Sequence, residues 1–196
     1  MKNQIEALMR LMPPHSGAGS VVDWPRVEQA WGTCFPDDYK QFVAVYGAGA
    51  IDGYLGVMTP EVSDDGRPAG AMEEETEIAR EDWGEDGAPR PEGISLGPER
   101  VMAWGVDATA DLLCWLASGD DPDAWPVVVY SRGKDRWILH QCGMVEFLCK
   151  IFHAEFDEHP LSGAELWGNA SPRFLTKSEE ESIRASGREP WSDAIV

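Results

Sequence analysis

Residues 24–57 constrain the fold of this chain more than any other segment. Asp23 and Pro25 are typical of a helix start, and Gly32 is typical of a helix end. Pro36 then begins a second helix, and Gly47 and Gly49 allow a sharp turn into a strand expected over 51–57. The apolar residues of this second helix follow i, i+3, i+4, i+7 spacing and are Tyr39, Phe42, Val43 and Tyr46. The segment therefore predicts two short helices that pack aromatic side chains against a sheet.

Further along the chain, short apolar segments predict a series of strands. Their connectors are short and carry Gly, Asp and Pro, as antiparallel hairpins require. No segment between them is long enough for the helix of a parallel crossover. The predicted strands are 94–96, 101–104, 112–116, 127–130 and 136–140. Apolar residues then recur at helical spacing over 144–152, which indicates a helix lying on the sheet.

The remaining segments complete an α+β prediction. Helices are expected over 5–12 and 72–83, with a last one capped by Thr176 and ending near Gly187, whereas 61–70 and 84–93 have the composition of loops. The expected architecture is N-terminal helices, a mostly antiparallel sheet of about five or six strands and a C-terminal helix packed on the sheet. One domain is expected over residues 1–196, with its core over about 20–156 and a peripheral C-terminal extension over 157–196.

The order of these elements resembles the opening and later strands of the SUKH superfamily (the Smi/Knr-like family). In that pattern a helix with a Glu-containing turn leads through Gly to a Leu/Phe-Pro-x-Asp/Glu-Tyr-Lys step, and an aromatic residue and a Gly-Gly-like turn then open the sheet. The chain supplies this order with Glu28, Gly32, Phe35, Pro36, Asp38, Tyr39, Lys40, Phe42, Tyr46, Gly47 and Gly49. The resemblance covers about residues 20–156, although 61–93 is longer and more acidic than the pattern and the tail after His159 has no counterpart. It implies a SUKH-like fold and, for a bacterial member, an immunity protein that neutralises a cognate secreted toxin by binding it.

The charge of the chain narrows the class of partner. Sixteen Lys and Arg against 35 Asp and Glu give a net charge of −19, and residues 61–125 alone hold 18 acids and 4 bases. A field this negative disfavours direct binding of nucleic acid or an anionic membrane and accelerates capture of a basic protein. The plainer interpretation is that the acidity keeps the protein soluble. No run of 18 apolar residues and no apolar signal-peptide core is present, so a cytoplasmic location is expected.

The acidic region also supplies the candidate partner-binding residues. Several of the nine tryptophans stand beside loops or acids, and exposed Trp within a charged rim is typical of a protein-binding hot spot. The alternative is that these indoles wedge long loops onto the domain. The candidates are Glu73, Glu74, Glu75, Glu77, Glu81, Trp83, Asp120, Asp121 and Trp125.

Motifs of catalysis and metal binding lack their structural context. Residues 93–97 match G-x-S-x-G, but Pro-rich chain precedes Ser95 and a turn follows it, whereas a nucleophile elbow needs a strand before it and a helix after it. His153 and His159 lack the i, i+4 spacing of a helical zinc pair. Residues 120–123 lack the central Gly and distant Glu of a calcium loop. The four cysteines show no C-x-x-C spacing, which favours reduced thiols. No catalytic residue, metal or cofactor is therefore expected.

The functional expectation is a cytoplasmic immunity protein and no enzyme. Toxins neutralised by the family include nucleases, whose active clefts are often basic, so an acidic surface over 61–125 would occlude such a cleft. The alternative is a non-enzymatic regulatory scaffold without a toxin partner, as in the fungal branch of the superfamily. Neither the identity of a toxin nor the oligomeric state follows from the sequence.

Overall fold

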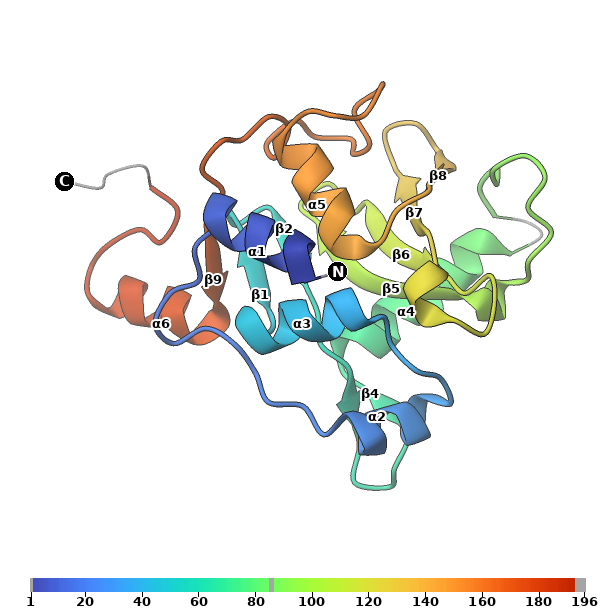
Figure 1. Ribbon diagram of the computed structural model, residues 1–196, viewed down its shortest axis with the longest axis horizontal. Coiled ribbons are helices and arrows are strands. Elements are labelled where there is room, and N and C mark those ends of the chain that lie inside the picture. The colour runs from blue at the N-terminus through green and yellow to red at the C-terminus, as the bar shows by residue number, and fades with distance from the viewer. Residues whose placement is uncertain (1, 85–86, 193–196) are drawn as a thin grey trace.

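The computed structural model describes residues 2–84 and 87–192. Seven strands form one sheet in the order β8-β7-β6-β5-β2-β1-β9, and every neighbouring pair is antiparallel. The strands are β1 (Gly49–Ile51), β2 (Leu55–Val57), β5 (Val101–Asp107), β6 (Leu112–Leu116), β7 (Val127–Ser131), β8 (Arg136–His140) and β9 (Phe174–Thr176) (Figure 1).

Helices cover both faces of this sheet. One face carries α1 (Lys2–Leu11), α3 (Asp37–Val45) and α5 (Met144–Phe152), which pack against one another, and the other face carries α4 (Ala71–Trp83) against β5 and β6 (Figure 1). A small hairpin of β3 (Glu61–Val62) and β4 (Pro68–Ala69) packs beside α2 (Trp24–Trp31). Finally, α6 (Lys177–Ala185) follows β9 at the edge of the sheet. The predicted α+β class is confirmed, including the closing helix on the sheet.

The core consists of aromatic contacts on both faces of the central strands. On the α3 and α5 side, the ring of Trp115 meets Tyr39 edge-on at 4.8 Å, and Trp104 contacts Phe147. On the α4 side, the rings of Trp83 and Trp137 lie 5.0 Å apart. All residues of β6 and β7 are buried because layers of helix cover them from both sides. Among the described helices, none is long and apolar enough to cross a membrane.

The helix boundaries expected from capping residues are confirmed. The carboxylate of Asp23 accepts a hydrogen bond from the backbone N–H of Arg26 at 3.3 Å, which satisfies a free donor at the start of α2. Gly32 ends α2 with φ of 67°, a conformation that glycine adopts at no steric cost. The hydroxyl of Thr176 likewise accepts from the N–H of Glu179 at 3.3 Å and begins α6.

Three local predictions are wrong. Residues 51–57 do not form one strand, because Asp52 and Gly53 adopt positive φ and turn the chain into the β1–β2 hairpin. The segment 61–70 is not all loop, since it contains β3 and β4. Residues 94–96 form no strand, because they cross the end of α4, where the carbonyl of Leu96 accepts the indole N–H of Trp83 at 2.9 Å. The predicted loop 84–93 includes residues 85–86, which lie outside the described residues.

The C-terminal segment takes part in the sheet. In β9, Leu175 pairs with Ala50 of β1, and Phe174 is only 2% exposed. Its ring packs against Phe42 and Tyr46 of the α3 region at 5.8 and 5.3 Å. The sheet therefore has seven strands instead of five or six, because the 51–57 prediction splits into two, β9 adds one and the predicted strand 94–96 does not form.

Candidate functional site

The acidic residues of α4 face solvent because the buried residues of this helix all face the sheet. The buried side chains are Met72, Thr76, Ala79 and Trp83. The opposite side of the helix carries Glu74, Glu77 and Glu81, all exposed, and Ile78, which is 41% exposed. These four residues are called the acidic face below. An apolar side chain thus lies in the middle of three carboxylates.

The predicted glutamates of α4 form no direct ion pair with a described cation, although the charges of Arg80 and Arg132 act on Glu73 and Glu75. None of Glu73, Glu74, Glu75, Glu77 and Glu81 forms an ion pair with a lysine, arginine or histidine in the part of the chain that the structure describes. Carboxylates four residues apart on a helix repel by roughly 0.2–0.5 kcal/mol per pair. Partial burial, and then the charges of Glu77 and Glu74, raise the pKa of Glu73. The repulsion lowers the stability of the helix, although Glu73 and Glu74 in its first turn also interact favourably with the helix dipole.

Glu73 and Glu75 lie on the two flanks of α4 and are half-buried. Burial, followed by the charge of Glu74, raises the pKa of Glu75, whereas Arg132 opposes this shift. The five glutamates that the sequence singled out are therefore not equivalent. Three of them form the acidic face, and the other two border neighbouring elements.

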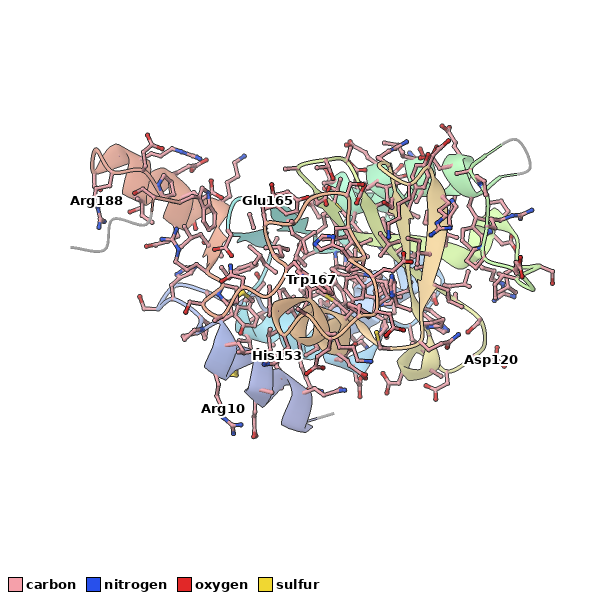
Figure 2. All side chains as sticks on the ribbon, turned by 90° about the horizontal axis from the view of Figure 1, so that it is seen from above. Arg10, Asp120, His153, Glu165, Trp167 and Arg188 are labelled. Atoms are coloured by element: carbon pink, nitrogen blue, oxygen red, sulfur yellow. The ribbon has the colours of Figure 1, made fainter. Side chains whose placement is uncertain are left out.

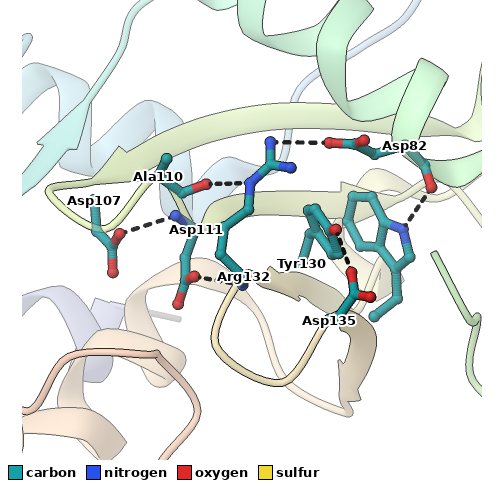
Figure 3. Close-up of polar contacts among 8 residues, drawn as sticks. Asp82, Asp107, Ala110, Asp111, Tyr130, Arg132 and Asp135 are labelled. Atoms are coloured by element: carbon teal, nitrogen blue, oxygen red, sulfur yellow. Dashed lines mark hydrogen bonds and ion pairs between the residues drawn. The ribbon is translucent and has the colours of Figure 1, made fainter. Parts of the chain in front are cut away.

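Arg132 holds the C-terminal half of α4 against the sheet. Its Nη2 lies 3.0 Å from Oδ2 of Asp82, its Nε donates to the carbonyl of Ala110 at 3.1 Å, and its guanidinium covers the ring of Tyr130 at 4.5 Å from the centroid (Figure 3). The indole N–H of Trp137 donates to the backbone carbonyl of Asp82 at 3.1 Å. Side chains of β7, β8 and their connecting turn thus fix the position and rotation of the acidic face.

The two candidate tryptophans are buried, so the expectation that they stand on the surface is wrong. Trp83 is 0% exposed and Trp125 is 4% exposed. The indole N–H of Trp83 holds the 94–97 segment through Leu96, and that of Trp125 donates to the carbonyl of Gly119 at 2.8 Å. Both indoles therefore attach loops to the domain, which was the alternative interpretation of the sequence.

Asp120 and Asp121 are exposed on the connector between β6 and β7. Asp121 also accepts from the N–H of Asp123 at 3.1 Å and begins the short 3-10 helix η2 (Pro122–Ala124). A hollow of about 470 Å³ lies between this connector and α4, and both Asp120 and Arg80 line it. Asp120 of the β6–β7 connector and Arg80 of α4 therefore line the same hollow, although they are far apart in the sequence.

The side chains considered for catalysis or metal binding are dispersed. Ser95 is exposed in irregular chain, and the short 3-10 helix η1 (Pro98–Arg100) follows it, so the motif has no strand-to-helix turn. Within residues 2–84 and 87–192, no group of three His, Cys, Asp or Glu side chains is placed to hold a metal ion. All four cysteines are free thiols, and burial raises the pKa of Cys142 to about 12 and that of Cys149 to about 11.

Sequence reasoning missed three residues of this surface. Ile78 carries a detectable signal, since it falls on the helix side opposite Met72 and Trp83 and so cannot belong to their buried stripe. Arg80 and Arg100 carry no such signal. They meet only because α4 and the chain before β5 come together in the folded protein.

Comparison with known proteins identifies a family that matches most of the chain. A family model described as SUKH_6, SMI1-KNR4 cell-wall, matches residues 23–148. No curated protein and no solved structure matches the chain. The matched range runs from the start of α2 into α5 and includes α4, the β6–β7 connector and the hollow, whereas β9 and α6 lie beyond it.

Proposed function

This chain belongs to the SUKH superfamily, and from that membership we propose that it is an immunity protein that binds a cognate secreted toxin in the cytoplasm and neutralises it. Bacterial members of the superfamily are largely immunity proteins, and these act by stoichiometric binding. The proposal therefore needs a surface suited to one protein partner.

The acidic face of α4 is the observation that carries this proposal. Ile78 supplies an apolar centre, and Glu74, Glu77 and Glu81 supply a charged rim, which is the layout of many binding hot spots. The three carboxylates repel one another in the free protein and are not paired with any described cation. A basic partner would relieve this repulsion, and the relief would contribute favourably to the free energy of binding.

The proposed mechanism is occlusion of a basic active cleft, such as that of a nuclease. Carboxylates of the acidic face take the positions that substrate phosphates occupy in the toxin, so substrate and immunity protein exclude each other. A net charge of −19 accelerates the encounter with a basic toxin, and this acceleration weakens as salt screens the field. Asp120 and Asp121 extend the negative surface beyond the hollow.

The test is co-expression with the toxin domain encoded by a neighbouring gene. The unmodified protein is expected to restore growth and to bind the purified domain in a 1:1 complex. The triple variant Glu74→Lys, Glu77→Lys, Glu81→Lys is expected to lose rescue, and its association rate at low salt should fall by about tenfold or more.

A matched control separates the surface from the net charge. Glu155→Lys, Glu181→Lys, Glu189→Lys changes the charge by the same amount at exposed positions. Glu181 and Glu189 belong to the region of α6 and Arg188, which lies at the opposite end of the molecule from Asp120 (Figure 2). The control is expected to retain rescue. Equal rescue and equal salt dependence for both triple variants would exclude the acidic face as the toxin-binding surface.

A further inference from the structure

The hollow beside the acidic face contains two arginines in the most acidic part of the chain, together with the carboxylates of Glu99 and Asp120. Residues 61–125 contain only four bases, and two of them, Arg80 and Arg100, line this hollow. The other two, Arg67 and Arg90, are not among its lining residues. The walls come from α2, α4, η1, β5 and the β6–β7 connector.

Both guanidinium groups retain unused donors. The Nε of Arg80 donates to the carbonyl of Val101 at 3.2 Å, and this contact fixes the side chain against the sheet. Acidic residues precede and follow Arg80 on the same helix, yet it forms no ion pair with any described carboxylate. The Nε of Arg100 lies 3.9 Å from Oε1 of Glu99, beyond hydrogen-bond distance, and both side chains are at least half exposed to water.

Part of the wall around these cations is aromatic or aliphatic, and hydrogen bonds hold its two indoles in place. The indole N–H of Trp31 donates to the carbonyl of Glu61 at 3.1 Å, and Trp125 is fixed through Gly119. Met102 of β5, 5% exposed, also lines the hollow, as does Cys34, an exposed residue with a free thiol. The hollow thus combines two arginines with rigid aromatic and aliphatic surface, a combination suited to a small anion that carries an apolar stem.

We propose that this hollow is a carboxylate-binding site that receives an acidic side chain of the partner protein. A carboxylate fits better than a phosphate, because Glu99 and Asp120 at the hollow repel a dianion more strongly than a monoanion, as does the net charge of −19. That the hollow binds a carboxylate is independent of the proposed function. That this carboxylate belongs to the partner protein rests on the proposed function.

The site would fix the register of the complex. A partner that meets the acidic face with basic residues must also present one Asp or Glu at the hollow, since an uncompensated lysine there would face two arginines. The hollow therefore adds a requirement that net charge alone does not impose. A toxin with a uniformly basic cleft would be discriminated against.

Cys34 provides a direct test, because its thiol lies among the lining residues of the hollow. The protein is alkylated in parallel with iodoacetate, which carries a carboxylate, and with neutral iodoacetamide, and the rate at Cys34 is followed by mass spectrometry of its peptide. The rate ratio of iodoacetate to iodoacetamide is expected to fall roughly threefold or more in the Arg80→Gln, Arg100→Gln variant.

The matched control is Arg67→Gln, Arg90→Gln, which removes the same charge from the same acidic region outside the hollow. This variant should leave the ratio nearly unchanged. An equal fall in both variants would mean that only the general field of the protein acts on Cys34, and no fall in either would mean that the arginines do not attract a carboxylate. Either result overturns the proposal.

Binding itself is measured by titrating ¹⁵N-labelled protein with N-acetylglutamate, N-acetylglutamine and inorganic phosphate. N-acetylglutamate should shift the indole N–H signals of Trp31 and Trp125, assigned from Trp→Phe variants, with a dissociation constant on the order of 1 mM. N-acetylglutamine should not shift them, and phosphate should shift them less. Equal shifts with all three compounds, or none with N-acetylglutamate, would overturn the site. These measurements use no toxin. A negative result would therefore not contradict the immunity role, and a failed rescue experiment would not affect the interpretation of carboxylate binding.

Discussion

The carboxylate of Asp38, in the first turn of α3, accepts a hydrogen bond from the backbone N–H of Val145, in the first turn of α5, at 3.0 Å. Asp123 of the β6–β7 connector serves α3 in the same way, because its carboxylate accepts from the N–H of Asp37 at 2.7 Å. Each helix start is thus satisfied by an acid from another part of the chain. The connector that bounds the hollow is thereby attached to the helical layer on the far face of the sheet.

This contact predicts an unusual pH dependence at Asp38. Burial raises the pKa of its carboxyl, and the charge of Asp123 adds to the rise, while the N–H of Val145 opposes it. A carboxyl whose pKa is higher in the folded than in the unfolded protein binds its proton more tightly when folded, so stability falls as pH rises through this window above about 3.8. Asp38→Asn keeps the acceptor without the charge and should remove this fall. Asp38→Ala loses the acceptor and should cost about 1 kcal/mol more than Asp38→Asn at pH 7. Urea unfolding of the unmodified protein and both variants just below pH 3.8 and at pH 7 measures this, and an unmodified protein that loses no stability relative to Asp38→Asn between these pH values would contradict it.

Neutralising the acidic face should stabilise the free protein. The triple variant Glu74→Gln, Glu77→Gln, Glu81→Gln removes like charges at helical spacing, but it also removes the favourable interaction of Glu74 with the N-terminal end of the helix dipole. The free energy of unfolding should therefore rise by roughly 0.5 kcal/mol, and calorimetry should show a rise in melting temperature of about 1–2 °C. The matched variant Glu155→Gln, Glu181→Gln, Glu189→Gln should show a smaller change. If the triple variant is more stable but binds the toxin more weakly, the carboxylates of the acidic face serve binding. If the triple variant is less stable, the carboxylates support the fold.

Local sequence signals predicted most of the fold but little of the site. The helix over 144–152 and the strands over 112–116 and 136–140 agree with the structure at both ends, because their apolar spacing and turn residues lie within the segment itself. The strand β9 was not predicted, because three residues are too few to show an alternating pattern of apolar residues and its partner β1 is far away in the sequence. Trp83 could not be assigned to core or surface, since the segment that covers it is irregular. The hollow could not be predicted at all, because its lining comes from five separate elements.

His140 should make the protein sensitive to mild acid. Burial, and then the charges of Lys134 and Lys150, lower the pKa of its imidazole from 6.5 to about 4. Its ring lies between Phe147 and Phe156, at 5.1 and 4.8 Å. Between pH 6.5 and 4 the unfolded chain binds a proton that the folded protein does not, so stability should fall with falling pH by about 3 kcal/mol in total. His140→Phe should flatten this dependence, and His153→Gln at an exposed position should not. An NMR titration midpoint for His140 near 6.5 would contradict the prediction.

The C-terminal strand should be essential for stability although the matched family range ends before it. Phe174 fills a site between Phe42 and Tyr46, and β9 covers the edge of β1 that would otherwise expose unpaired backbone groups. Phe174→Ala should therefore lower the free energy of unfolding by about 3–4 kcal/mol. Ile183→Ala is the matched comparison, because it lies in α6, which has no buried residue, and it should cost less than about 1 kcal/mol. Denaturant unfolding of both variants gives the two values. Similar small losses would mean that residues 157–196 are a peripheral extension, as the sequence alone suggested, and a large loss for Phe174→Ala alone would make β9 part of the core.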